Sequence, residues 1–556
     1  MGANPTAGST PTQRKAGDMV PYLLQEGFAH GLLQAAGDGV APDKGGLDPL
    51  ALARWQFTIT TIYHYIIVPI SIGLSLFLAI CQTMWLRTKE RHWWSAVRFF
   101  GPIFVVTFAV GVATGLVQEF QFGMNWSEYS RFVGDVFGTP LALESLFAFF
   151  TESVLLGLWV FGYGALSPRL HTATIWGLTL AAHLSACFII GANSWMQHPV
   201  GAVFDPATGR AALDGWAGFV AIITNWTLWT AILHVCVSSW IVAGALVGGI
   251  SWWWMVKTRR THANAARPSP TPASPEASPA PAAGSAAAGS ASRTWRPLVR
   301  FSAWAILASS VLTLITGHLQ GIQMATEQPM KLAAGEAYCK PVEGGAPLAL
   351  IAFGSDCSNI KTYGAIPGGL SFLATGSFTG KVLSVPEIER SYQDYFGKAG
   401  SERGRTDSYH PPFMLTFWSF RLMILLQLLV PLFAIGALIA TRSGRTPRKG
   451  RLWGLALLPL PSLAAVAGWV YTEVGRQPWI VHPNFEGGKT DLYLLTNQGL
   501  SQVGVSPTQL ALSLTLSTLL YLLLAVVWAV LVAKKVRAGL PKARKRQSHA
   551  RELSFQ

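Results

Sequence analysis

The sequence predicts an all-α, polytopic membrane protein with nine transmembrane helices, its N-terminus outside and its C-terminus in the cytoplasm. Its mean hydropathy is +0.36 and 12% of its 556 residues are charged, which is too apolar for a soluble globular protein. Several segments also exceed the roughly 20 apolar residues that cross a bilayer core. The predicted spans are 56–84, 98–120, 140–164, 172–192, 218–250, 299–317, 412–440, 452–473 and 509–533.

The distribution of basic residues predicts the orientation of the chain, whose net charge is +15. Basic residues gather in segments 87–94, 257–262, 441–451 and 534–546, which share one side of the membrane if nine spans alternate. The positive-inside rule places that side in the cytoplasm. Basic segments beside a membrane meet anionic lipid, so no nucleic-acid partner is predicted.

The regions between the spans differ in composition. Residues 1–47 lack the continuous apolar core of a cleavable signal peptide, so the first span is expected to remain as an anchor. Stretch 20–34 suits either a short amphipathic helix or a mobile extension. Residues 263–292 are rich in Pro, Ala and Ser, a composition that is typical of a tether. The chain divides into 1–50 (extension), 51–256 (helices 1–5), 257–298 (cytoplasmic linker), 299–411 (helix 6 and outer loop), 412–533 (helices 7–9) and 534–556 (basic tail).

The five cysteines divide by position. Cys81, Cys187 and Cys236 lie in spans and are expected to be small buried apolar residues. Cys339 and Cys357 lie in the loop predicted outside, where disulfides are permitted. A bridge across their 18-residue separation would contribute about 3 kcal/mol. We predict this disulfide, with two free thiols as the alternative; no second pair indicates a zinc site.

Ionisable side chains inside the spans are the main functional signal, because each costs roughly 2.5–3.5 kcal/mol near the bilayer centre. An ion pathway, a proton relay and cofactor ligation all remain open as explanations. Glu144 and Glu152 are eight residues apart, about 12 Å along one helix and broadly on one side, which suits two stations of a proton path. The residues concerned are His64, Glu144, Glu152, His183, His234 and Glu473.

Two further features carry weaker signals. Met423 in "RLM" fits core filling, although a His/Met pair is an axial set for low-spin haem; spacing alone does not bring it to His234. Lys331 and Glu336 in "QPMKLAAGEA" stand at the outer membrane face. They form either a solvated charge pair or a donor and acceptor for a polar headgroup arriving from the lipid.

Seven motifs in this order resemble subunit I of the cytochrome bd-type quinol oxidases, of the short quinol-loop type. The resemblance runs from about Leu52 to the ninth span, apart from the linker. The motifs are "ARWQFTITTIYHY", "GVATGLVQEFQFGMNW", "GTPLALESLFAFFTES", "GANSWMQHP", "QPMKLAAGEA", "RLM" and "GWVYTEVGRQPW".

The resemblance implies a terminal respiratory oxidase in the bacterial cytoplasmic membrane. It would oxidise quinol at the outer face and reduce dioxygen to water with protons from the cytoplasm. The implied cofactors are two haem b and one haem d, with haem b in place of haem d in some members. The implied partners are a homologous subunit II, small single-span subunits in some members, and ubiquinol or menaquinol, which the sequence does not distinguish.

The resemblance also implies ligands for the haem irons. His234 and Met423 match the axial ligands of the low-spin haem b. His64 and Glu473 match ligands of the two high-spin haems, without assignment of which haem each holds. In this interpretation iron offsets the charge of Glu473 and a haem propionate offsets that of Arg476.

Other positions match residues around these cofactors. Arg421, Arg476 and Trp469 match residues beside the haems, and Trp479 is expected to pack on a porphyrin or to anchor the interface. Lys331 and Glu336 match the quinol-binding pair. The matched proton-route carboxylates are Glu144 beside the oxygen-reducing haem, Glu152 next on the route, and Glu119 at the end of the second span.

Some positions depart from the family pattern. His318 in "GHLQG" replaces a frequent acidic residue, and His198 and His410 are expected at the loop surface. His183 is expected to be a hydrogen-bonded histidine within its span. Two alternatives remain: a cyanide-insensitive quinol oxidase with b haems only, and, in another class, a haem-binding redox sensor. Transport would predict inverted repeats or broken helices, which the sequence does not show.

Overall fold

The computed structural model describes residues 48–265, 283–401, 406–447, 449–485, 491–501 and 506–540. Most of the predicted extension, the centre of the linker and most of the basic tail lie outside these ranges. In the part described, nine helical segments are long and apolar enough to cross a membrane, as predicted. Their orientation in the membrane stays a prediction.

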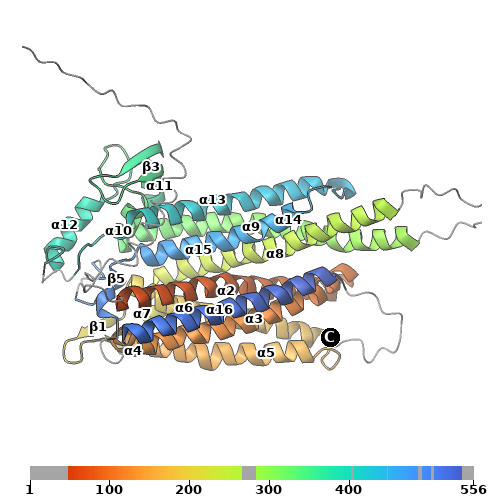
Figure 1. Ribbon diagram of the computed structural model, residues 1–556, viewed down its shortest axis with the longest axis horizontal. Helices are drawn as coiled ribbons and strands as arrows, with labels where there is room; N and C mark the ends of the chain where they lie inside the picture. The colour runs from red at the N-terminus through yellow and green to blue at the C-terminus, as the bar shows by residue number, and fades with distance from the viewer. Residues whose placement is uncertain are drawn as a thin grey trace, which may run out of the picture.

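The helices lie side by side along the long axis of the molecule (Figure 1). The segments that supply the spans are α2 (Pro49–Thr88), α3 (Arg91–Met124), α4 (Ser127–Leu143) with the π-helical turn η1 (Glu144–Phe149) and α5 (Phe150–Phe161), α6 (Pro168–Gln197), α7 (Gly215–Ile223) with α8 (Trp226–Ala265), α9 (Ala283–Glu327), α13 (Phe413–Ala440), α14 (Trp453–Leu457) with α15 (Pro459–Val474), and α16 (Pro507–Ala538).

The remaining elements are short, and most gather at one end of the bundle, which we call the loop end (Figure 1). Three antiparallel two-stranded sheets are added there to the predicted all-α fold. These elements are β1 (Ala202–Asp205) with β2 (Arg210–Leu213), α10 (Pro329–Gly335), β3 (Leu348–Phe353) with β4 (Lys361–Ile366), α11 (Gly369–Thr375), α12 (Val385–Phe396), β5 (Trp479–Val481) with β6 (Leu494–Leu495), and the 3₁₀ turns η2 (Arg442–Gly444) and η3 (Thr496–Gln498).

Local sequence signals explain several helix starts. Asp48 precedes Pro49 and accepts a hydrogen bond from the backbone N–H of Leu50. Ser167 before Pro168 caps α6 in the same way. Each pair places a capping oxygen at the N-cap and a proline at the first helical position, where its missing N–H is not needed.

The fifth predicted span is broken in the structure. The sequence predicted one helix over 218–250, whereas α7 ends at Ile223 and α8 begins at Trp226. The Asn225 side chain accepts a hydrogen bond of 3.1 Å from the N–H of Thr227 and donates one of 3.2 Å to the carbonyl of His198. An asparagine that caps a helix from the preceding position favours a new start over continuation, which apolar content does not register.

Other boundaries also differ from prediction. The third span begins at Ser127, earlier than the predicted 140, and α9 continues to Glu327 beyond the predicted 317. α8 and α9 both extend into the predicted linker, to Ala265 and from Ala283. Amphipathic helical turns continue past the apolar core of a span, so hydropathy marks the membrane core and not the helix ends.

The loop after α10 is folded against the bundle. Cys339 and Cys357, the predicted pair, form a disulfide with a Cα–Cα distance of 5.4 Å. Trp479 is buried among aromatic side chains of this region, so the expectation that it packs on a porphyrin or anchors the interface is wrong. Its ring contacts are Tyr392, Phe396, Tyr409, His482 and Tyr493.

Candidate functional site

Two histidines of different spans are held in the same way. His64 Nδ1 on α2 lies 2.9 Å from Thr114 Oγ1 on α3, and His234 Nδ1 on α8 lies 3.0 Å from Thr316 Oγ1 on α9. Each threonine hydroxyl donates its proton to a backbone carbonyl one turn earlier in its own helix. We infer from these bonds that the hydroxyl oxygen accepts from Nδ1–H, the tautomer that leaves the Nε2 lone pair of each imidazole available.

A glycine follows each of these threonines and makes room for the ring. A Cβ atom on Gly115 would lie 3.1 Å from His64 Cε1, and one on Gly317 would lie 3.4 Å from His234 Cε1. The Thr–Gly pairs 114–115 and 316–317 thus fix the tautomer and admit the edge of the imidazole. The sequence contains both pairs, but only the structure shows which histidine each pair contacts.

Met423 and His234 lie at similar depths from the loop end. The break at Asn225 leaves His234 eight residues into α8, and Met423 is ten residues into α13, which correspond to about 12 and 15 Å of helix. Met423 Sδ packs toward α15, 2.8 Å from the place of a Cβ on Gly468. The sequence alone had placed His234 much deeper, because it did not show the break.

Glu473 lies one residue before the end of α15, beside a cavity of about 300 Å³. Its carboxylate contacts Arg476 Nη2 at 2.5 Å and accepts a hydrogen bond of 2.8 Å from Asn193 Nδ2 on α6. Arg476 and Trp469 also line the cavity, and Trp469 stacks on Tyr65 with ring centroids 5.0 Å apart. Arg476 and Asn193 thus both bind the Glu473 carboxylate, whereas the sequence interpretation assigned its charge to iron.

Arg476 retains hydrogen-bonding capacity at this cavity. Its side chain is 6% exposed, and Nε and Nη1 have no hydrogen-bond partner among the described residues. Buried donors without partners are uncommon in proteins and indicate an absent group at the site. A bidentate anion such as a carboxylate fits the free edge of a guanidinium.

A chain of hydrogen bonds connects the buried Lys331 to Glu473. Lys331 Nζ donates to Gln197 Oε1 at 2.6 Å, and Gln197 Nε2 donates to Asn193 Oδ1 at 2.7 Å. Asn193 then donates to Glu473. Burial, with the nearby positive charge of Arg476, lowers the pKa of Lys331 to about 7.

Glu336 pairs with Arg421 and not with Lys331. Arg421 Nη1 and Nη2 contact the two carboxylate oxygens of Glu336 at 3.0 and 2.6 Å, and Nε donates to the carbonyl of Ala349 at 3.0 Å. Glu336 and Lys331 are each 2% exposed, so the interpretation as a solvated loop pair is wrong. Burial raises the pKa of the Glu336 carboxyl, and Arg421 opposes that rise.

The π-helical turn η1 changes the relation between Glu144 and Glu152. Eight residues of α-helix would leave the two side chains about 80° apart around the axis, and the extra residue of a π turn reduces this to about 20°. Glu144 accepts a hydrogen bond of 2.8 Å from Ser185 Oγ, and Glu152 is buried. Glu119, exposed near the end of α3, and Glu152 both lie close enough to Glu144 for their charges to interact.

The remaining histidines give mixed outcomes. His183 is hydrogen-bonded as predicted, to the carbonyl of Thr179 at 2.7 Å and by Trp240 Nε1 at 3.2 Å. His318 stacks on Phe372 with centroids 4.9 Å apart. The prediction of a surface position for His198 is wrong, because its side chain is 16% exposed and contacts a buried carboxylate. His410, half-buried, has Nδ1 3.2 Å from the carbonyl of Pro411.

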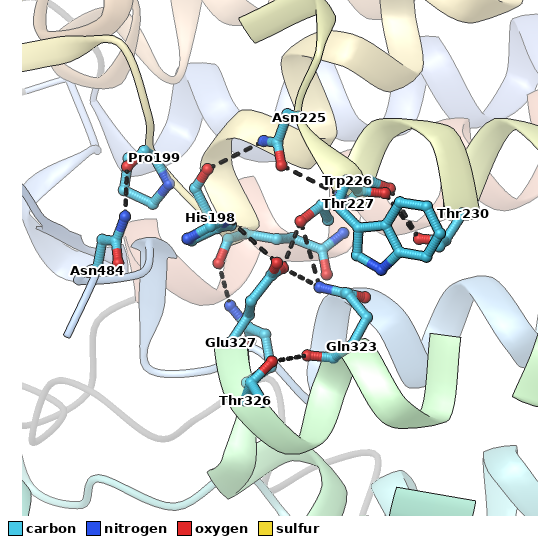
Figure 2. A network of polar contacts seen from close by, with 12 residues as sticks. His198, Pro199, Asn225, Trp226, Thr227, Thr230, Gln323, Thr326, Glu327 and Asn484 are labelled. Carbon is cyan, nitrogen blue, oxygen red and sulfur yellow. Dashed lines mark hydrogen bonds and ion pairs between the residues drawn. The ribbon is translucent and has the colours of Figure 1, made fainter. Parts of the chain in front are cut away.

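That carboxylate belongs to Glu327, which sequence reasoning missed. Figure 2 shows the Glu327 carboxylate between His198, Thr227 and Gln323. Glu327 Oε1 lies 3.2 Å from His198 Nδ1, and Oε2 accepts hydrogen bonds from Thr227 Oγ1 and Gln323 Nε2. The available sequence signal was a lone acidic residue just before "QPMK", but the predicted span ended ten residues earlier, so Glu327 was assigned to a loop.

The comparisons with known proteins agree with this architecture. The model of the cytochrome bd terminal oxidase subunit I family matches residues 52–540. Subunit 1 of a Bacillus subtilis cytochrome bd ubiquinol oxidase is 33% identical over 89% of this chain and 94% of that protein. Subunit 1 of the Escherichia coli cytochrome bd-II ubiquinol oxidase is 30% identical over 88% and 97%.

A solved structure shows the same fold. A chain of the bd oxidase from Geobacillus thermodenitrificans superposes with a TM-score of 0.71 at 24% sequence identity, covering 89% of this chain and 99% of that one. The family model and the two relatives cover nearly the whole described bundle. This chain therefore belongs to the cytochrome bd terminal oxidase subunit I family.

Proposed function

We propose that this chain carries two b haems and one d haem, oxidises quinol at the loop end and reduces dioxygen to water with protons from the opposite, cytoplasmic side. Membership of the family implies a membrane-bound quinol oxidase with haem cofactors and a second large subunit. Two relatives are named as ubiquinol oxidases and a third, 23% identical, as a putative menaquinol oxidase. We therefore propose a quinol without choosing the headgroup.

The single observation that carries the haem proposal is the common arrangement of His64 and His234. Both imidazoles present a free Nε2 because a threonine fixes Nδ1–H. A hydrogen-bonded Nδ1–H is the usual support of a metal-ligating histidine. We propose His64 as a ligand of one high-spin haem, and His234 with Met423 as the axial pair of the low-spin haem.

The cavity beside Glu473 supports a second high-spin site. Its walls combine apolar side chains with the free donors of Arg476, which suits the apolar ring and anionic propionates of a porphyrin. We propose Glu473 as the iron ligand, Trp469 as a packing surface and Arg476 as the partner of a propionate. Bound haem supplies the electron transfer and oxygen chemistry, whereas these residues bind and orient it.

Quinol binding is proposed at Lys331 and Glu336. Both side chains are buried at the loop end, where a headgroup entering from the lipid would meet an ammonium donor and a carboxylate. Arg421 holds Glu336 in a fixed orientation through two parallel hydrogen bonds. This fixed geometry would direct the hydrogen bonds of the quinol hydroxyl groups.

Proton delivery is proposed along Glu152, Glu144 and Glu119. The π turn directs Glu144 and Glu152 to nearly the same side of their helix, and Glu144 is within electrostatic reach of both other carboxylates. Carboxylates that approach one another in this way can pass a proton along the helix. Their position inside a span favours a route over a structural role.

The test is an absorption spectrum of the purified complex with subunit II, reduced with quinol and compared with its oxidised form, together with quinol-dependent oxygen uptake. A chlorin band beside haem b bands, with oxygen uptake, supports the proposal. Haem b bands alone, with oxygen uptake, favour the b-only oxidase. Haem without oxygen uptake favours the redox sensor, and the absence of haem overturns the ligand assignments.

Met423→Leu tests the low-spin ligands in the same preparation. The low-spin signal should disappear while the complex still assembles. Met414→Leu, on the same helix nine residues earlier, is the matched control and should leave the spectrum unchanged. A normal low-spin signal in the Met423 variant contradicts the assignment.

A further inference from the structure

Glu327 and His198 form a buried acid–base pair beside the proposed quinol site. The Glu327 side chain is 7% exposed and the His198 side chain 16%. Thr227 and Gln323, both buried, donate to the other carboxylate oxygen. Two donors and the close contact with His198 thus hold a carboxylate at a depth where a buried charge is retained only if it is paired.

The backbone around His198 is fixed as firmly as the carboxylate. Asn225 donates to the carbonyl of His198 at 3.2 Å, and Asn484 donates to the carbonyl of Pro199 at 3.0 Å, as Figure 2 shows. α6 ends at Gln197, directly before His198, and Gln197 accepts the hydrogen bond from Lys331. The pair is therefore connected through one residue to the lysine proposed to bind quinol.

The pair is also in electrostatic contact with that lysine. The charge of Glu327 acts on Lys331, which follows it by four residues. Quinol oxidation releases two electrons and two protons, so a base is needed at the place where the hydroxyl groups bind. A neutral imidazole held by a carboxylate provides a base whose protonated form is stabilised on the spot.

We propose that the Glu327–His198 pair accepts the protons that quinol loses at the loop end and passes them to water there. This inference rests on the proposed quinol oxidation. In each transfer one quinol O–H bond breaks and an N–H bond forms at His198 Nε2, while an electron leaves for the haems. The pair changes from a net charge of −1 to zero. The N–H bond then breaks as the proton passes to water, and the pair is ready for the second proton.

The experiment must distinguish the effect of the pair on activity from the effects of the other titratable groups near it. Lys331 on α10 titrates near neutral pH, as described above. Burial and the charge of Lys331 lower the pKa of His482 to about 3, so this histidine remains neutral at working pH. Arg476 adds a fixed positive charge to the surroundings of both. Among these groups, the pH dependence of kcat must therefore be assigned either to the pair or to Lys331.

His198→Gln distinguishes these two possibilities. The experiment measures quinol-dependent oxygen uptake by the assembled complex between pH 5 and 9, with haem content determined from the spectrum. In the wild type, kcat should rise with pH, because a base accepts the quinol proton only in its unprotonated form. In the variant, kcat should fall on the order of 10²-fold and this rise should disappear, with unchanged haem content and quinol KM. If the rise belonged to Lys331, it would remain.

Matched controls and a second variant complete the test. His410→Gln and Glu343→Gln change a histidine and an exposed carboxylate of the same end and should match the wild type. Glu327→Asp retains the carboxylate but holds it farther from the imidazole, so kcat should fall while the haem content stays unchanged. If either variant of the pair shows the kcat and pH profile of the wild type, the inference is overturned. If the wild-type complex itself does not oxidise quinol, the proposed function is overturned instead.

Discussion

His64 Nδ1 and Thr114 Oγ1 lie 2.9 Å apart on two neighbouring spans, and the hydroxyl accepts because it has already donated its proton to its own helix. The same relation joins His234 to Thr316. Two sites built alike from residues 170 positions apart (234 − 64) indicate one physical requirement: an imidazole with a defined tautomer and a free Nε2.

Thr316→Val tests this requirement. Valine keeps the shape of threonine but removes the acceptor of His234 Nδ1–H, so the imidazole loses its orientation and haem should bind about 10–100-fold more weakly. Haem content and the low-spin band of the purified complex measure the effect. Thr313→Val, one turn earlier on α9 and hydrogen-bonded only to its own helix, is the control. Equal haem content in both variants would contradict the role of Thr316.

Arg421→Met tests the buried ion pair with Glu336. The substitution leaves a carboxylate of 2% exposure without its partner, which should lower the free energy of unfolding by about 3–5 kcal/mol. Thermal unfolding of the assembled complex measures this loss. Arg390→Met, at an exposed position of α12, should change the stability by less than about 0.5 kcal/mol.

The pH dependence of that loss has a defined sign. Burial already raises the pKa of Glu336, and removal of Arg421 should raise it further. An acid whose pKa is higher in the folded state than in the unfolded state loses stability as the pH rises through that interval. The variant should therefore be relatively more stable at pH 5 than at pH 8, and the opposite order would exclude this cause.

Gln197→Leu tests the chain from Lys331 to Glu473. Leucine removes the acceptor of the buried ammonium group, so the pKa of Lys331 should fall below about 7. In the variant, Lys331 is then protonated in fewer molecules at pH 7.5 than at pH 6. The quinol KM of the variant should therefore exceed the wild-type value by more at the higher pH. Steady-state oxygen uptake at both pH values measures this. Gln393→Leu on α12 is the control, and a pH-independent change in KM would contradict the mechanism.

Deletion of Phe147 tests the π turn. Removing one residue from η1 should restore a regular α-helix in which seven residues separate Glu144 from Glu152, so the two side chains should stay about 20° apart around the axis and oxygen uptake should persist. Deletion of Thr151, which lies between η1 and Glu152, keeps the π turn and should rotate Glu144 by about 100° relative to Glu152. Oxygen uptake should then decline, while reduction of the haems by quinol should persist. Equal turnover in the two variants would contradict a role of this orientation in proton delivery.

Sequence reasoning succeeded for the spans and less well for the partners of their charged residues. It selected Glu473, Lys331 and Glu336 as unusual, but one of its interpretations paired Lys331 with Glu336, and it assigned the charge of Glu473 to iron without identifying Asn193 or Arg476 as protein partners of the carboxylate. In the structure Glu336 binds Arg421, which is 85 residues away. Spacing along one helix does not report which neighbouring helix a side chain faces.

Helix ends limited the prediction in a similar way. Hydropathy ended the sixth span before Glu327, so Glu327 was assigned to a loop. It also carried the fifth span through Asn225, so the capping role of Asn225 was not recognised. Both errors concern polar residues at the boundary of the membrane core. There, capping and tertiary hydrogen bonds decide the backbone, and the apolar content of a window carries no information about them.

The sequence by itself determined the nine spans and the types of ionisable residue inside them. The reason is physical: crossing hydrocarbon requires about 20 apolar residues, and each charge inside must have a function or a partner. Only the tertiary structure decided the partners: Thr114 for His64, Arg421 for Glu336 and His198 for Glu327. These contacts depend on the rotation and depth of packed helices, which residues far apart in the chain set together.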